Sequence, residues 1–239
     1  MSLEDYGRQT RNPAFNVILV VALLAVYEAG LVLSGSLRRN AADTWLKETL
    51  GGLGPNGILA FHTAVFGAFV IAALHFWRRR RPLFRYLPPF FVEAALYAGL
   101  LSPLVIWLQQ PFLARGGADG YFLDLGAGVY EELVFRWLMI RGSFFLLHLD
   151  PWRVFEFGTG ARLRDYLRLL GPLVAIVVGS SLLFAAYHHV GPGGEAWSLS
   201  AVLFRSLAGL ILAAIFFARG LAMAVYVHAF YDLLVHLVG

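Results

Sequence analysis

Apolar runs long enough to cross a lipid bilayer recur along the whole chain and restrict its fold more than any other feature. The 239 residues are 59% hydrophobic and 14% charged, whereas a soluble domain carries about 45–50% apolar and about 25% charged residues. A membrane-spanning helix needs about 20 apolar residues, and seven runs come near that length. The sequence therefore predicts an all-α polytopic membrane helix bundle of seven spans. The runs cover residues 15–34, 57–77, 88–108, 121–149, 169–190, 199–218 and 221–238.

Basic residues between the runs predict the orientation of this bundle, because cytoplasmic loops carry an excess of Lys and Arg. The N-terminal segment and the loops after the second, fourth and sixth runs hold 12 Arg, including the run Arg78–Arg81, against four basic residues on the other side. We therefore predict a cytoplasmic N-terminus and an extracytoplasmic C-terminus, in the inner membrane of a bacterium. The same loops account for the net charge of +4, so the expected partners are membrane lipids and no nucleic acid. An eighth, interfacial helix is predicted at residues 42–50.

The fourth run contains charged residues that a spanning helix avoids. Glu131, Glu132 and Arg136 lie inside the apolar stretch 121–149, where each charge costs about 2.5–3.5 kcal/mol on insertion scales. On an α-helix Glu132 and Arg136 share a face and can neutralise each other. Glu131 is rotated by about 100° from Glu132, so it needs a partner from elsewhere in the chain.

Two later runs offer polar partners for Glu131. The fifth ends with Phe184 and His188, which share a helical face, and the seventh holds His228 and Asp232 at the same spacing. A carboxylate four residues after a histidine can orient the imidazole and select its tautomer. These helices are therefore expected to direct a glutamate, a histidine and a histidine–aspartate pair into one place.

Two other interpretations of these polar residues are open. They could form a charge-paired structural cluster, or an acid–histidine relay that carries protons or ions. Two further carboxylates, Glu28 and Glu93, stand alone in the first and third runs. A structural pairing is favoured for both, and a functional role outside the core chemistry is the alternative.

Together, the three motifs resemble the CPBP family, also called the CAAX protease and bacteriocin-processing, or Abi, family of intramembrane glutamic-type proteases. The family pattern is a glutamate pair with an arginine five residues after the first, then Phe-x-x-x-His, then His-x-x-x-Asn/Asp. This chain follows the pattern in that order from about residue 120 to its end. Asp232 departs from the prenyl-protease branch, which usually has asparagine there. The resemblance implies one integrated membrane domain with three N-terminal helices in residues 1–119 and a four-helix catalytic core in residues 120–239.

The resemblance also implies a role for each motif residue. Glu131 would be the general base that activates a water shared with His188, and His228 with Asp232 would stabilise the oxyanion of the tetrahedral intermediate. A positioned base and hydrogen-bond donors around the oxyanion are the two requirements of amide hydrolysis. The supporting residues would be Glu132, Arg136 and Phe184.

No cofactor is expected for this chemistry. Zinc held by Glu131, His188 and His228 is the alternative, since two histidines and a glutamate leave a position open for water. The sequence has no His-Glu-x-x-His motif, no Gly-x-Ser-x-Gly motif and no cysteine, which excludes zincin-type, serine-elbow and thiol proteases.

The predicted function is that of an intramembrane endopeptidase, a hydrolase that cuts a membrane-anchored or C-terminal peptide near the membrane surface. The predicted orientation opens the site to the outside, which favours a C-terminal sorting segment over a CAAX-like peptide on the cytoplasmic face. A non-catalytic immunity or scaffold protein that binds a peptide without cutting it is the alternative outside the enzymes.

Overall fold

All the regular secondary structure that the computed structural model describes is helical. The described residues are 2–52, 54, 56–78, 83–109, 120–150, 163–190, 194 and 196–238, and no strand occurs among them. Helices long and apolar enough to cross a membrane confirm a helical membrane protein, whereas the predicted count of seven or eight spans is not confirmed. Four were found in the described part: α2 (Pro13–Ser34), α4 (Asn56–Arg78), residues Arg168–Tyr187 of α8 (Leu163–Tyr187), and α9 (Leu199–Arg219).

The remaining elements account for the other predicted runs and for the segment between the first two. The third run is α5, and the seventh is the shorter apolar helix α10. The predicted helix at 42–50 exists as α3. The bounds are α1 (Leu3–Thr10), α3 (Ala41–Gly52), the 3₁₀ helix η1 (Leu83–Arg85), α5 (Leu87–Gln109), α6 (Gly120–Glu132), the π-helix η2 (Leu133–Arg141), α7 (Gly142–Leu146) and α10 (Leu221–Val238).

The fourth run is helical from Gly120 to Leu146 but is not one α-helix. It changes to a π-helix directly after Glu132 and returns to an α-helix at Gly142. π-Helical turns are rare and occur frequently at functional sites. Of the loop arginines used for the orientation, Arg79, Arg80, Arg81, Arg115, Arg153 and Arg162 lie outside the described residues.

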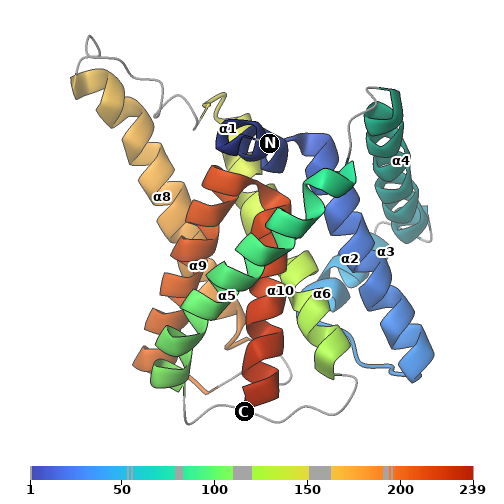
Figure 1. The fold of residues 1–239 in the computed structure, drawn as a ribbon. Coiled ribbons are helices and arrows are strands. Elements are labelled where there is room, and N and C mark those ends of the chain that lie inside the picture. Colours follow the sequence, from blue (N-terminus) through green and yellow to red (C-terminus); the bar gives the residue numbers. More distant parts are fainter. Residues whose placement is uncertain are drawn as a thin grey trace. The chain divides into compact units, whose positions relative to one another are not determined.

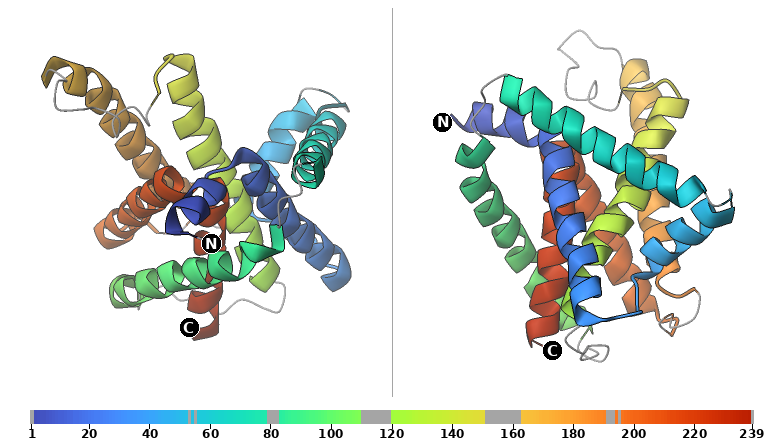
Figure 2. Two further views of the ribbon diagram at one scale, coloured as in Figure 1. Left: turned by 45° about the horizontal axis from the view of Figure 1, so that its top comes forward. Right: turned by 90° about the vertical axis from the view of Figure 1, so that its right-hand side faces the viewer.

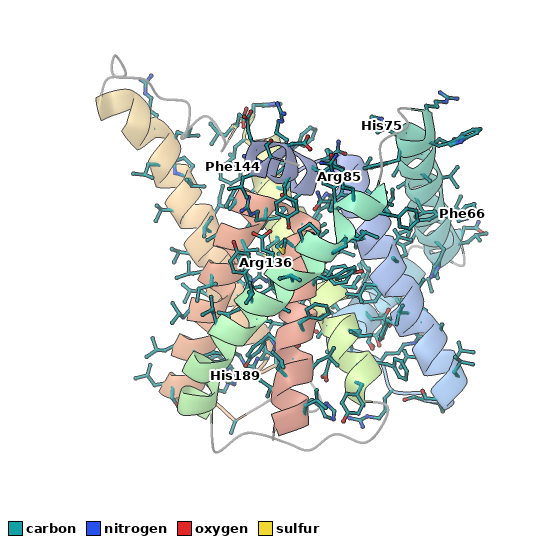
Figure 3. The ribbon with its side chains drawn as sticks, in the orientation of Figure 1. Phe66, His75, Arg85, Arg136, Phe144 and His189 are labelled. Carbon is teal, nitrogen blue, oxygen red and sulfur yellow. The ribbon has the colours of Figure 1, made fainter. Side chains whose placement is uncertain are left out.

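Large apolar side chains on the outer helices face away from the protein. On α4, Phe66 is 68% exposed and Ile71 is 70% exposed, and Figure 3 shows Phe66 pointing outward from this helix. A soluble domain keeps such side chains in its core, whereas a helix in a bilayer turns them to lipid. The exposure pattern therefore agrees with a membrane protein.

The chain divides into two compact units. The first comprises residues 1–132 and 218–239, and the second comprises residues 133–217. The boundary falls inside the glutamate–arginine motif, so Glu131 and Glu132 belong to the first unit and Arg136 to the second. The predicted division into N-terminal helices (residues 1–119) and a catalytic core (residues 120–239) does not depend on this boundary and stays a prediction.

In the first unit α10 packs against α6, α5 and α2 (Figures 1 and 2). The Asn16 side chain accepts a hydrogen bond from the backbone N–H of Ala222 at 2.6 Å and so caps the first turn of α10. Gly220, just before this helix, has a φ of +91°, a left-handed conformation that glycine adopts without steric cost. These contacts fix where α10 begins.

The two isolated carboxylates both have structural partners in the first unit, as predicted. Glu93 on α5 receives a hydrogen bond from Arg219 at 2.7 Å and others from Tyr6 and Tyr97. Glu28 on α2 pairs with Lys47 at 2.8 Å and with Arg39 at 3.1 Å. Neither carboxylate is needed to explain the chemistry of the candidate site.

Candidate active site

The last turn of α6 brings two carboxylates against the middle of α10. This close approach requires Gly128, because a Cβ there would lie 2.7 Å from Ala229 Cβ and 2.8 Å from the carbonyl oxygen of Val225. Glu131 and Glu132 follow directly on α6, and both side chains are buried. The missing side chain at Gly128 therefore lets the glutamate pair reach α10.

His228 on α10 is the residue that these carboxylates meet. Its Nδ1 lies 2.9 Å from Oε1 of Glu132. Its Nε2 lies 3.3 Å from Oδ2 of Asp232, one turn further along α10, and 3.9 Å from Oε2 of Glu131. Three carboxylates from two helices thus surround one buried imidazole.

The surroundings of His228 determine what its ring can do. A neutral imidazole donates from one nitrogen only, whereas an imidazolium donates from both. With carboxylate oxygens of Glu132 and Asp232 at opposite nitrogens, the charged ring can donate to both at once. A cation held this way is suited to stabilising negative charge that develops beside it.

Glu131 has a further contact that the sequence analysis missed. Its Oε1 accepts a hydrogen bond from Nδ2 of Asn40 at 3.2 Å. Asn40 precedes α3, the helix predicted at residues 42–50, and asparagine is a preferred residue at that position. An asparagine before a predicted helix indicates where the helix starts. No residue near Asn40 in the sequence indicated that its side chain would contact Glu131.

The second unit holds the remaining predicted residues. Arg136 on η2 is 1% exposed and donates a hydrogen bond from Nη2 to the carbonyl oxygen of Gly209 on α9 at 3.2 Å, and Figure 3 labels its place among these helices. Its guanidinium lies 4.6 Å from the centre of the Phe184 ring, within the range of a cation–π interaction. Phe184 therefore helps to hold a buried cation.

His188 lies directly after the last residue of α8. Its Nδ1 is 2.8 Å from the carbonyl oxygen of Phe184, and its ring packs edge-on against the Phe184 ring. A carbonyl oxygen only accepts, so Nδ1 carries the hydrogen, and in the neutral ring Nε2 is an acceptor. The Phe-x-x-x-His spacing thus selects the tautomer that can receive a proton or the O–H of a water molecule.

The structure groups the predicted residues into two sets. Glu131, Glu132, His228 and Asp232 come together in the first unit; Arg136, Phe184 and His188 come together in the second. Of the two glutamates, Glu132 lies closer to His228, although Glu131 is the one assigned as the base. Two predicted contacts would join residues of different units and therefore stay predictions. They are the pairing of Glu132 with Arg136 and the approach of His188 to Glu131.

A second acid–histidine pair extends the face of α10 that carries His228 and Asp232. His236 Nδ1 lies 2.9 Å from Oδ2 of Asp124 on α6, and the Tyr121 ring stacks on the His236 ring at 4.4 Å. His236 therefore links α10 to α6. Positions 228, 232 and 236 are four residues apart, so they share one face of α10.

Metal ligation has no support among the described residues, where no group of three His, Asp or Glu side chains is arranged to hold an ion. Zinc bound by Glu131, His188 and His228 therefore remains an untested alternative.

Comparison with known proteins identifies a family match. Residues 119–234 match the family model described as type II CAAX prenyl endopeptidase Rce1-like. No curated protein and no solved structure matches the chain. The matched range includes all three motifs and leaves Asn40 outside.

Proposed function

In residues 119–234 this membrane protein belongs to the Rce1-like family of type II CAAX prenyl endopeptidases, a family of intramembrane hydrolases, and we propose that it cleaves peptide bonds with a water molecule activated by Glu131. The observation that carries the proposal is the placement of Glu131 and Glu132 around the buried ring of His228. This placement brings a proton acceptor on α6 beside a hydrogen-bond donor on α10.

The chemistry divides between these residues. Glu131 accepts a proton from water while the water oxygen attacks the carbonyl carbon of the scissile bond. Glu132 holds Nδ1–H of His228 and orients the ring. Nε2–H of His228 turns from Asp232 to the carbonyl oxygen as that oxygen becomes an oxyanion. Glu131 then gives its proton to the amide nitrogen as the C–N bond breaks, so one water is consumed and an acid and an amine are formed.

The residues of the second unit complete the proposal. His188, with its Nδ1 held by the Phe184 carbonyl, accepts an O–H of the same water at Nε2 and orients its lone pair toward the substrate. Arg136 provides a fixed positive charge, which Phe184 and the Gly209 carbonyl hold in place.

The proposed substrate is a membrane-anchored peptide cut near its C-terminus. Glu131 and His228 are 3% and 5% exposed, so a substrate must enter from the bilayer or thread between helices. A peptide already held in the membrane by a lipid or an apolar segment meets this requirement by lateral diffusion. Two test peptides distinguish between the possible substrate classes. One is a prenylated CAAX-like peptide, and the other carries an apolar C-terminal sorting segment.

The decisive experiment measures cleavage of both peptides by the purified protein in detergent and in liposomes. Wild type is compared with Glu131→Gln and His188→Ala, and with the matched control Glu48→Gln, which removes an exposed carboxylate from α3. We expect Glu131→Gln to lower kcat by at least about 10³-fold, since the general base itself is removed. His188→Ala should lose about 10²-fold, and Glu48→Gln should match wild type.

A zinc chelator distinguishes the two readings of Glu131. Activity that persists in chelator supports a glutamate-activated water. Activity that chelation abolishes and zinc restores would make Glu131 a metal ligand. Equal product from wild type and Glu131→Gln would refute the proposed site.

A further inference from the structure

Asn40 lies in the connection between α2 and α3, 91 residues before the carboxylate that it contacts. It is outside the residues that match the family model. We propose that Asn40 is a positioning residue that fixes the Glu131 carboxylate for proton transfer. This inference rests on the proposed role of Glu131.

The direction of the Asn40 amide follows from its second hydrogen bond. Oδ1 of Asn40 accepts the backbone N–H of Ala42 at 2.8 Å, the usual bond of a helix N-cap. The flipped amide would direct its NH₂ at this N–H and its oxygen at the Glu131 carboxylate, which removes both bonds. The start of α3 therefore requires Nδ2 to face Glu131.

The backbone of Asn40 is also held in place. Its N–H donates to the Tyr27 hydroxyl at 3.3 Å, and this hydroxyl donates to Oδ2 of Asp43 at 2.8 Å. Asp43 is fully buried and pairs with Arg39 at 2.9 Å and Lys47 at 2.8 Å. Ion pairs at the start of α3 thus hold the segment that carries Asn40.

The helix that carries Glu131 rests on the same tyrosine. A Cβ at Gly126 of α6 would lie 2.4 Å from the Tyr27 ring, so the helix backbone and the ring are in direct contact. Tyr27 therefore sets the position of α6 as well as that of Asn40, and the distance from Nδ2 to the carboxylate does not depend on a flexible loop.

The two oxygens of the Glu131 carboxylate therefore have different neighbours. Oε1 is occupied by Asn40, and Oε2 is the oxygen on the His228 side, 3.9 Å from Nε2. A donated hydrogen bond stabilises the ionised carboxylate, which is the form that accepts a proton. This matters because other anions crowd Glu131.

The charged and titratable groups of this unit around Glu131 come from each neighbouring helix. They are Glu132 on α6, His228 and Asp232 on α10, Glu28 on α2, and Arg39, Asp43 and Lys47 in and before α3. Glu132 and Asp232 oppose ionisation of Glu131, whereas His228, when charged, and Asn40 favour it.

Two substitutions separate this role from helix capping. Asn40→Ser and Asn40→Asp keep a side-chain oxygen that caps α3. Aspartate has no donor for Glu131 and adds a negative charge, and the serine hydroxyl is one bond shorter than the Nδ2 that it replaces, so it does not reach Glu131 while it caps the helix. The matched control is Thr44→Val, which removes the hydrogen bond from the exposed Thr44 hydroxyl to the Asn40 carbonyl oxygen. Glu131→Gln is assayed in parallel to test the proposed function itself.

We expect Asn40→Ser to lower kcat by about tenfold, the effect of one hydrogen bond to a charged group, with KM changed less than twofold. Asn40→Asp should lower kcat further. In both variants the acid limb of the kcat profile should move to higher pH, because a proton competes better for a carboxylate that has lost its donor. Thr44→Val should retain the wild-type rate and profile.

Three results would overturn the inference. One is wild-type kinetics in Asn40→Asp while Glu131→Gln is inactive. Another is a lower kcat at every pH with the acid limb unmoved, which is the signature of a smaller folded fraction. The third is the same loss in Thr44→Val. Full activity in Glu131→Gln would instead remove the proposed function on which the inference stands.

Discussion

Gly128→Ala tests the contact that brings the carboxylates of α6 to His228. The added Cβ would lie 2.8 Å from two backbone atoms of α10, the nitrogen of Ala229 and the oxygen of Val225, whereas ordinary contacts begin at 3.4 Å. Backbone atoms cannot rotate away, so α6 and α10 must separate locally by about 0.6 Å.

That separation has a cost in stability and in geometry. Overpacking of a close contact costs about 1–3 kcal/mol. The bond between Glu132 and His228, now 2.9 Å, would lengthen to about 3.5 Å, the limit of a hydrogen bond. A displacement approaching 1 Å at a reacting group costs up to about 10²-fold in rate, so we expect kcat to fall by about 10- to 100-fold.

The assay is thermal unfolding of the purified protein in one detergent together with peptide cleavage below the midpoint. Gly99→Ala is the matched control, because Gly99 lies in α5 of the same unit with no atom within 4 Å of an added Cβ. Its midpoint should stay unchanged or rise, since alanine is the better helix former. Wild-type midpoint and activity in Gly128→Ala would refute the close approach of α6 and α10.

Two further predictions concern the start of α10 and the start of α3. Asn16→Ala removes the acceptor for the Ala222 N–H and should lower the free energy of unfolding by about 1–2 kcal/mol; an unchanged midpoint would show that Asn16 is not the cap. Burial by itself raises the pKa of Asp43, but hydrogen bonds from Lys47 and Arg39 outweigh it and hold that pKa below its ordinary value. Asp43 therefore stabilises the fold fully above about pH 4, and this contribution is lost as the pH falls further through its folded-state pKa. Asp43→Asn should be less stable than wild type at neutral pH and should lose less stability on acidification. Parallel pH profiles of stability for the two proteins would contradict this.

The glutamate pair shows where sequence reasoning stopped. The spacing of Glu131 and Glu132 indicated that they look in different directions, and the family resemblance made Glu131 the base. In the structure both carboxylates face His228, and Glu132 makes the shorter contact. The helix changes from α to π directly after Glu132, and no spacing in the sequence indicated this change.

The features that the sequence determined by itself are those that depend on local geometry. The length of the apolar runs requires helices in a bilayer, because only internal hydrogen bonds satisfy the backbone there. The four-residue spacings place His228 beside Asp232 and His188 beside Phe184, since each helical turn contains about 3.6 residues.

The tertiary structure decided which distant residues meet. Gly128 permits the approach of α6 to α10, and Asn40 contacts Glu131 across 91 positions of sequence. The neighbouring sequence indicates neither contact. It does not show that a glycine lacks room for a Cβ, and it does not show which distant residue an asparagine at a helix start will contact. Contacts between helices depend on the shapes of both surfaces, and those shapes exist only once the helices are packed.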